Sequence, residues 1–449
     1  GKQITPNMSR DGIGGAFVIW NDKSTNQNGE IYATHLSADG TILNPEVGIP
    51  IISGGGTHAK VSIEVSGNGF ANLVWEEWIS DEETDIYAQR LDVSCNTLWS
   101  TPEEGGIVLC SEPGYQYTPK VNDLTDTISA VVWQDRRNNP MTGDIFIQFI
   151  DENGIELLQA NGISVCTDPA MQKLPRLKAD EESAYVIWED FRNHYQWGDI
   201  YAQRVTLGNG TEWIENGQPI STEIRKQYAP RLTTDGLGGA YFVWMDERNA
   251  DYPEVEIYIQ HASLDGELSF EENGLRVCDA PDKQVNPLVR PDGSGGVMAV
   301  WADHRLGSIG LYAQHITPEN GISLDDNGVE LYFGIDGNGV SPNSLYLGDD
   351  RTLLYWEDHR LGGDDPITYG QIITSDFDQI NENNGIYLSL NPHQVNPKAV
   401  KAGEHIFLNF TSENSDYGTV VQYYQILDIE LNIVGDPEGV PVYFQDWDT

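Results

Sequence analysis

The chain has 449 residues, with 25 Lys and Arg against 70 Asp and Glu, and a formal net charge of −45. A surface this acidic repels nucleic acid and anionic lipid, so we expect neither as a partner. No apolar run approaches the ~18 residues of a membrane-spanning helix, which argues against membrane insertion. Gly1, Lys2 and Gln3 already belong to a repeated unit and no signal peptide precedes them, so we interpret the chain as a mature or excised segment.

A tryptophan recurs at intervals of 54 to 58 residues, and Phe410 takes its place in the last copy. The series is Trp20, Trp75, Trp133, Trp188, Trp244, Trp301 and Trp356. A period of this length, filled with strand-like segments and Gly-rich turns, is typical of four-stranded units arranged radially. The sequence therefore predicts an all-β fold, an eight-bladed β-propeller of four-stranded antiparallel blades that forms one domain over residues 1–449. The expected repeats are approximately 1–53, 54–111, 112–167, 168–222, 223–279, 280–333, 334–390 and 391–449.

Within each repeat the elements follow one order, which the fourth repeat shows well. Short β-branched or aromatic runs at 174–177, 183–188, 199–204 and 217–220 predict strands A, B, C and D. Gly-rich segments such as 235–239 and 292–296 predict tight A–B hairpins. Successive connections alternate between the two ends of a blade, so the B–C loops and the D-to-A crossovers share one face. We expect that face to carry binding sites.

Two polar columns accompany the tryptophans near this face. An acid stands two residues after Trp in seven copies, and an arginine stands four residues after it in five: Arg137, Arg192, Arg248, Arg305 and Arg360. Five arginines could indicate the arginine cluster of a sialidase. We favour a structural Asp–Arg pair within each blade, because a group supplied once per blade serves the blade.

Two further columns concern strands C and A. Strand C carries an aromatic residue in every copy, which we expect to pack between blades beside the tryptophan. At the entry to strand A a glutamine precedes a proline by three residues: Gln3, Gln116, Gln172, Gln227, Gln284 and Gln394. Each glutamine could cap its own crossover loop, or all could ring the channel mouth and bind water, an ion or a sugar hydroxyl.

The four cysteines argue against a disulfide framework. Cys110, Cys166 and Cys278 occupy one column, and equivalent positions on different blades should lie beyond the ~7 Å Cα limit for a bridge. Cys95 and Cys110 share one repeat, so a bridge between these two stays open.

The pattern Trp-x-Asp-x-Arg followed by Asp-Ile-Tyr-Ala-Gln-Arg, at 188–192 and 199–204, resembles repeats of large secreted proteins of Bacteroidetes and related bacteria. Proteins of that kind often carry a C-terminal type IX secretion sorting domain, and none is visible before Thr449. The resemblance implies export and a propeller, and no established activity. It therefore implies an extracellular or cell-surface location.

Residues that break the repeat on the loop-bearing face are the candidate ligand-binding residues. They are Trp78, Tyr115, Tyr195, Trp197, Tyr252 and His58, with nearby acids contributing polar contacts. Exposed aromatic rings beside carboxylates suit carbohydrate, whose apolar face stacks while its hydroxyls bond to acids and amides.

Metal signals are weak, and we expect no cofactor. The acids at 81–85 and the segment 336–339 offer oxygen ligands that Ca²⁺ prefers, but neither has the spacing of an EF-hand loop. No His or Cys pattern predicts zinc.

Three functions remain in competition. The leading one is a propeller module that binds polysaccharide or a surface protein without catalysis, as a monomeric domain of a larger chain, with no catalytic residue assigned. The second is a carbohydrate-active enzyme, a glycoside hydrolase or polysaccharide lyase, with acids on the loop-bearing face. The third is a structural or adhesin segment.

Overall fold

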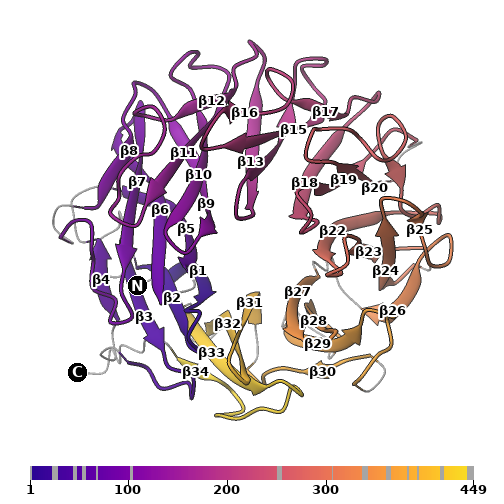
Figure 1. The fold of residues 1–449 in the computed structure, drawn as a ribbon. Helices are drawn as coiled ribbons and strands as arrows, with labels where there is room; N and C mark the ends of the chain where they lie inside the picture. The colour runs from indigo at the N-terminus through magenta and orange to yellow at the C-terminus, as the bar shows by residue number, and fades with distance from the viewer. Residues whose placement is uncertain are drawn as a thin grey trace.

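The computed structural model describes residues 3–22, 29–43, 48–52, 57–66, 69–101, 105–249, 255–305, 307–335, 342–360, 366–381, 384–391, 394–414 and 419–441. Every element in these ranges is a β-strand, and the strands form eight antiparallel sheets around a central axis (Figure 1). The prediction of an eight-bladed all-β propeller is therefore confirmed. The described part of the chain has no helix with the length and apolarity needed to cross a membrane.

Each blade is a meander of successively paired strands. Blades 1 and 2 comprise β1 (Gln3–Arg10), β2 (Ala16–Asp22), β3 (Glu30–Leu36), β4 (Ile49–Ile52), β5 (Thr57–Ser66), β6 (Phe70–Ser80), β7 (Glu83–Leu91) and β8 (Ile107–Cys110). Blades 3 and 4 comprise β9 (Gln116–Thr125), β10 (Ile128–Asp135), β11 (Asp144–Asp151), β12 (Ile163–Cys166), β13 (Gln172–Ala179), β14 (Ala184–Asp190), β15 (Asp199–Thr206), β16 (Gly210–Thr211) and β17 (Gln218–Ser221).

The second half of the ring repeats this arrangement. Blades 5 and 6 comprise β18 (Gln227–Thr234), β19 (Ala240–Asp246), β20 (Glu256–Ala262), β21 (Leu275–Arg276), β22 (Gln284–Pro291), β23 (Val297–Asp303), β24 (Ile309–Thr317), β25 (Gly321–Ile322) and β26 (Val329–Ile335). Blades 7 and 8 comprise β27 (Asn343–Gly348), β28 (Arg351–Asp358), β29 (Ile367–Thr374), β30 (Ile386–Tyr387), β31 (Gln394–Ala402), β32 (His405–Asn414), β33 (Thr419–Asp428) and β34 (Val440–Pro441). In blades 4 and 6 the last strand (β17 or β26) pairs with the third strand (β15 or β24), which also pairs with the short strand β16 or β25.

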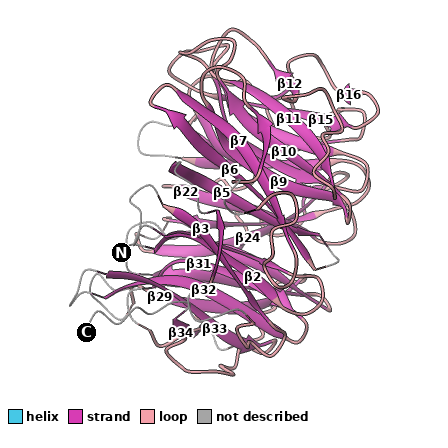
Figure 2. Ribbon diagram, turned by 90° about the vertical axis from the view of Figure 1, so that its left-hand side faces the viewer, coloured by secondary structure: helices cyan, strands magenta, loops and turns pink. Residues whose placement is uncertain are grey.

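The first strand of every blade lies innermost. Around the axis, each of these strands contacts the first strands of the two neighbouring blades, in the order β1, β5, β9, β13, β18, β22, β27, β31 and back to β1. The ring closes by packing between blades 8 and 1, because each of these blades is built from consecutive strands of one end of the chain. The side view shows the sheets of successive blades stacked face to face (Figure 2).

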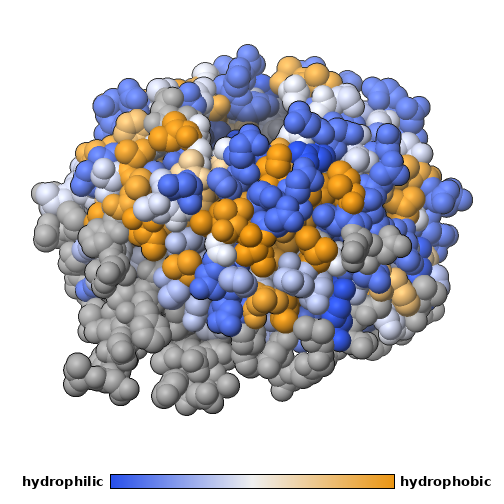
Figure 3. All heavy atoms as spheres, turned by 90° about the horizontal axis from the view of Figure 1, so that it is seen from below, coloured by the Kyte–Doolittle hydropathy of each residue, from blue (hydrophilic) through white to orange (hydrophobic). Residues whose placement is uncertain are grey.

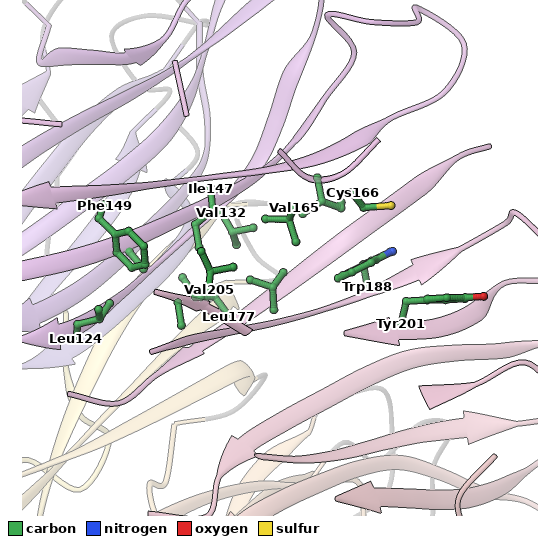
Figure 4. Close-up of a cluster of buried hydrophobic side chains, with 14 residues drawn as sticks. Leu124, Val132, Ile147, Phe149, Val165, Cys166, Leu177, Trp188, Tyr201 and Val205 are labelled. Atoms are coloured by element: carbon green, nitrogen blue, oxygen red, sulfur yellow. The ribbon is translucent and has the colours of Figure 1, made fainter. Parts of the chain in front are cut away.

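The hydrophobic core is divided into eight clusters, one at each contact between successive blades. Between blades 3 and 4, for example, Trp188 and Tyr201 pack against Val132 and Ile147 (Figure 4). All seven tryptophans of the repeat are at most 1% exposed, and six of them stack on the aromatic residue of the third strand of their own blade. The prediction that both columns pack between blades is confirmed.

The Asp–Arg column adds hydrogen bonds and ion pairs at the same contacts between successive blades. Arg192 donates from Nη2 to Asp190 at 2.6 Å and to the carbonyl of Asn216 at 2.8 Å, both in its own blade. The same nitrogen lies 3.2 Å from the sulfur of Cys166 in the preceding blade, and the guanidinium stacks 3.9 Å from the centre of the Tyr201 ring. The five arginines make this Asp pair in each of their blades, so the structural interpretation is confirmed.

The glutamines that precede strand A are buried caps. Gln172, Gln227 and Gln394 each donate from Nε2 to carbonyls of the crossover loop just before them. These three side chains are 0% exposed, and so are Gln116 and Gln284. Of the two interpretations, the loop cap is correct for Gln172, Gln227, Gln284 and Gln394. Gln116 is equally buried, but its side chain makes no hydrogen bond within the described part of the chain.

All four cysteines are buried and unbridged, so the pairing of Cys95 with Cys110 does not form. Burial raises the pKa of Cys110 and of Cys166 to about 12. Both side chains are therefore neutral thiols at neutral pH, and they serve as small groups against the arginine of the next blade.

A bulge interrupts the innermost strand of most blades directly before its proline. In β13 the pairing shifts between Lys173 and Arg176, and Leu174 adopts a positive φ of 55°. The same residue of the repeat has a φ of 52° to 55° at Thr118, Ala229, Asn286 and Asn396. A bulge changes the direction of the side chains that follow it. The residue after the proline therefore faces the axis in each of these blades.

One side of the outer edge of the ring is seen in the space-filling view. Seen from below, apolar side chains are interspersed with polar ones around this edge (Figure 3).

Candidate functional site

The axis of the propeller encloses a channel with a volume of about 680 Å³. Its wall is formed by the innermost strands of blades 2 to 8, together with Glu357 from the end of β28. A volume between about 300 and 1,000 Å³ is typical of pockets that hold a small organic ligand. The channel is therefore large enough for a few sugar units.

Six positively charged side chains line this channel: Lys120, Arg176, Lys178, Arg231, Arg290 and Lys398. Four of them directly follow the strand-A proline, and the other two stand two residues further along their strands. The whole chain has only 25 Lys and Arg and 70 acids, whereas among the residues that the structure describes a single acid, Glu357, lines the channel. The sign of the charge in the channel is thus opposite to that of the whole molecule.

These cations act on one another across the channel. The pKa of Arg176 is lowered to about 10 by burial and by the charge of Arg231. Burial, followed by the charges of Arg231 and Arg176, also lowers the pKa of Lys398, which comes from the opposite part of the ring. Among the described residues, none of these three side chains forms an ion pair within 4.0 Å. The charges of Glu189 and Glu357 act on Arg176 and Lys398 in the opposite sense, but burial and repulsion outweigh them and the pKa of each cation is lowered.

Glu357 is the carboxyl group that the described part of the wall contains, and it is held by the next blade. The backbone N–H of Asn396, at the bulge of β31, donates to its Oε1 at 2.6 Å. Burial raises the pKa of Glu357, against the lowering effects of His359 and Lys398. Glu189 has the same place in blade 4 and accepts the N–H of Ala229 at 2.9 Å, but it pairs with Lys173 at 3.4 Å. Glu357 thus combines a repeated backbone contact with a position in the channel.

The structure brings together two of the predicted ligand-binding residues. The rings of Trp78 and Tyr115 meet edge to face, with centroids 6.2 Å apart. Trp78 donates from its indole to Glu76 at 3.0 Å, and Tyr115 donates to the carbonyl of Asp81 at 2.5 Å. Arg136 stacks over Tyr115 at 5.8 Å. This group lies between blades 2 and 3 at the end where β9 begins.

Tyr195 and Trp197 form a separate aromatic group in the loop between β14 and β15. His194 stacks against Trp197 with centroids 4.1 Å apart and against Tyr195 at 5.8 Å. Tyr195 is 80% exposed and Trp197 38%, so both rings are open to solvent. Among the described residues no ring contact joins them to Trp78 or Tyr115. Tyr252 lies outside the described residues.

His58 is only 3% exposed, and its Nδ1 is bonded to Glu77. Glu77 also accepts the indole N–H of Trp75 at 3.1 Å. Blade 2 has no arginine in the column that pairs with this acid in other blades, and His58 takes over the contact. Its side chain is therefore engaged within blade 2 rather than presented on the loop-bearing face.

Among the described residues no group of three His, Cys, Asp or Glu side chains is placed to hold a metal ion. The acidic run at 81–85 belongs to this part of the chain, whereas the segment 336–339 lies outside it.

The channel cations were missed by the sequence analysis, although a signal was present. Lys120, Arg176, Arg231 and Lys398 each follow the proline of the repeat. Four cations in one column are conspicuous in a chain with 25 in total. We treated repeated columns as structural, and therefore did not consider that this one converges on the axis.

No protein-family model and no curated protein sequence matches the chain. Among solved structures, it is similar to the polysaccharide lyase Uly1, with 11% identity and a TM-score of 0.46 over 80% of this chain and 88% of that chain. It is also similar to the endo-arabinase from Bacteroides thetaiotaomicron, with 14% identity and a TM-score of 0.32 over 60% of this chain and 95% of that chain. The α-L-arabinanase of Penicillium chrysogenum matches with 12% identity and a TM-score of 0.35, over 71% of this chain and 93% of that chain.

These comparisons contradict our leading expectation of a propeller that binds without catalysis, because the similar structures are enzymes. They agree better with the second expectation, a carbohydrate-active enzyme. At such identities and TM-scores the likeness concerns the fold, and an activity has to be argued from the residues of the site.

Proposed function

We propose that this protein is a carbohydrate-active enzyme that cleaves a glycan bound in the central channel, with Glu357 as the proton donor. The observation that carries the proposal is a half-buried carboxyl of raised pKa in the wall of a channel of about 680 Å³. When a glycosidic bond breaks, the departing oxygen needs a proton. A carboxyl group whose pKa is raised above its ordinary value can supply it as a general acid.

Aromatic rings near the channel mouth support a sugar as the ligand. β9 begins at Gln116, and Lys120 of the same strand lines the channel. Tyr115, directly before this strand, is thus roughly 16 Å from Lys120 along the chain, at ~3.3 Å per strand residue. The ring of Trp78, from β6, lies against Tyr115. Sugar rings stack on aromatic faces. The channel and this aromatic pair could therefore hold successive units of one glycan chain.

The exposed rings of Tyr195 and Trp197 offer a second place where a polysaccharide could stack. The resemblance of the repeats to secreted proteins of Bacteroidetes supports an extracellular or cell-surface location, where polymeric glycans are encountered. In hydrolysis, water would supply the new bond to the anomeric carbon. In elimination, the sugar would lose a proton and form a C=C bond as the C–O bond breaks. We propose no cofactor for either reaction.

The test is an activity screen with a matched pair of variants. Neutral and acidic polysaccharides are incubated with the protein, and products are followed by reducing ends and by the ultraviolet absorbance of unsaturated sugars, which separates hydrolysis from elimination. Glu357→Gln should lower the turnover number by about 100-fold or more, the usual contribution of a general acid. Glu189→Gln, which alters the same backbone contact outside the channel wall, should stay within about twofold.

Two results would contradict the proposal. One is the absence of product from every polysaccharide tested. The other is an active wild type whose turnover number is unaffected by Glu357→Gln, which would place the proton donor elsewhere.

A further inference from the structure

We infer that the channel is a binding site for an acidic glycan, whose carboxylate or sulfate groups are held by Arg176, Arg231 and Lys398. The inference rests on the proposed function and names the class of substrate for the same site.

The first argument is the distribution of charge. Acids outnumber cations by 70 to 25 in the chain, so a cation placed at random would have acids around it. Among the described residues, the channel instead gathers six cations and one acid. A wall of this kind selects ligands by charge, because an opposite charge inside a partly desolvated cavity interacts more strongly than it does in bulk water.

The second argument is that, in the described part of the chain, Arg176, Arg231 and Lys398 make no ion pair within 4.0 Å, and the charges of Glu189 and Glu357 offset only part of the repulsion. Arg176, Arg231 and Lys398 come from three blades, and each of the first two lowers the pKa of Lys398 through its charge. Like charges held together oppose folding. Clusters of like charge that destabilise the folded state are expected at ligand-binding sites, because a ligand of opposite charge neutralises them when it binds.

The third argument concerns the size of the ligand. A single small oxyanion fills a small part of a volume of about 680 Å³ and reaches only one or two of the cations. Four cations directly follow the proline of their strand, whereas Lys178 and Arg290 stand two residues further along. Arg290 also donates a hydrogen bond to Ser344 at 2.6 Å. Cations at two depths suit a ligand with repeated anionic groups, and an acidic glycan has one such group in many of its sugar units.

The bond geometry of the cations adds specificity. A guanidinium group can donate two parallel hydrogen bonds to a carboxylate or sulfate, whereas an ammonium group acts as a point charge. Arg176 and Arg231 supply the first kind of contact and Lys398 the second. Together with Glu357 in the same wall, this arrangement places the anionic group of a sugar beside the proposed proton donor.

The test is calorimetric binding to the catalytically impaired Glu357→Gln protein, so that no ligand is consumed. The probes are tetragalacturonate, a sulfated carrageenan tetrasaccharide, neutral maltotetraose and inorganic sulfate. We expect at least one acidic tetrasaccharide to bind at least tenfold more tightly than maltotetraose and than inorganic sulfate. Adding Arg176→Gln and Arg231→Gln should weaken that binding at least tenfold, whereas Arg10→Gln, at the exposed end of β1, should not change it.

A melting measurement separates recognition from folding. If these arginines serve a ligand, the double variant should melt at the same temperature as its parent or higher in the absence of glycan, since repulsion is relieved. A lower melting temperature together with unchanged affinity would show that the arginines are structural and would overturn the inference.

Other outcomes are also decisive. Equal affinity for acidic and neutral tetrasaccharides, or tightest binding of inorganic sulfate alone, would overturn an acidic glycan as the occupant. Binding of acidic glycans without cleavage by the wild type would leave the inference standing and contradict the proposed enzyme. Cleavage of neutral glycans without affinity for acidic ones would support the proposed enzyme and overturn the acidic glycan as its substrate.

Discussion

At the scale of single residues, blade 2 shows how one missing side chain changes its neighbours. In blade 4, Asp199 lies opposite Asp190 and is bonded to Asn193 at 2.7 Å, while Arg192 neutralises Asp190. Blade 2 pairs Glu77 with Asp85 in the same register, but has neither the arginine nor the asparagine. Asp85 is 7% exposed, and burial, followed by the charges of Glu83 and Glu77, raises its pKa to about 6.

This pKa predicts how stability depends on pH. The folded protein holds a proton on Asp85 up to about pH 6, whereas an unfolded chain releases it near pH 4. The free energy of unfolding should therefore fall as the pH rises from about 4 to 6, since the folded state binds more protons in this range. Asp85→Asn should match the wild type below pH 4 and exceed it above pH 6 by about 1–3 kcal/mol in urea unfolding.

Asp39 provides a control of opposite sign. Hydrogen bonds from Ser37 and Thr41 lower its pKa to about 2, so its ionised form stabilises the folded state at neutral pH. Asp39→Asn should be less stable than the wild type at pH 7, and the difference should vanish toward pH 2. If Asp85→Asn is also less stable than the wild type above pH 6, the interpretation of Asp85 is wrong.

At the scale of elements, a turn before the fourth strand joins the polar and apolar parts of each contact between blades. In blade 3, Asn161 and Gly162 both have positive φ, at 64° and 79°. The carbonyl of Asn161 accepts a hydrogen bond from Arg137 at 2.8 Å, and Gly162 covers the ring of Trp133. The turn therefore depends on the tryptophan being buried beneath it, and the arginine holds the turn in place.

Gly162→Ala should be strongly destabilising for two reasons. A Cβ at this position would lie 2.4 Å from Cη2 of Trp133 and 2.8 Å from the carbonyl oxygen of Ile147, and the positive φ adds backbone strain. We expect the free energy of unfolding to fall by about 2–4 kcal/mol in urea titrations.

Gly236→Ala is the matched control for the backbone. Its φ of 75° is similar, but a Cβ there would have no neighbour within 4 Å. It should cost about 1 kcal/mol. Equal losses in the two variants would show that the contact with Trp133 contributes nothing.

At the scale of the whole molecule, closure of the ring separates two regions of opposite charge. The channel concentrates cations, while the chain as a whole has a net charge of −45. An acidic glycan approaching from solution first meets repulsion and then, inside the channel, attraction. The long-range part is screened by salt more readily than contacts within the cavity.

The salt dependence of binding should show this separation. The association rate constant of tetragalacturonate, measured by stopped-flow tryptophan fluorescence, should rise between about 10 and 150 mM NaCl, because the Debye length falls from about 30 to 8 Å. The rate constant for maltotetraose should hardly change. A steady fall for tetragalacturonate would show that the potential around the channel mouth is already attractive.

The sequence by itself determined the number of blades, the order of strands within each blade and the residues at the contacts between blades. These features are local or periodic, because Trp188, Asp190 and Arg192 stand within five residues and recur with every repeat. Because the spacing of residues along a strand determines which face each side chain occupies, such features can be predicted from the sequence.

The tertiary structure alone decided where repeated positions converge. Arg176, Arg231 and Lys398 are separated by 55 to 222 residues and occupy the same repeat position. A bulge at each proline and the closure of the ring bring them to one channel. Trp78 and Tyr115 are 37 residues apart and meet because blades 2 and 3 pack side by side. Position along the chain indicates which strand a residue occupies, but only the closed ring determines which residues face each other across the axis.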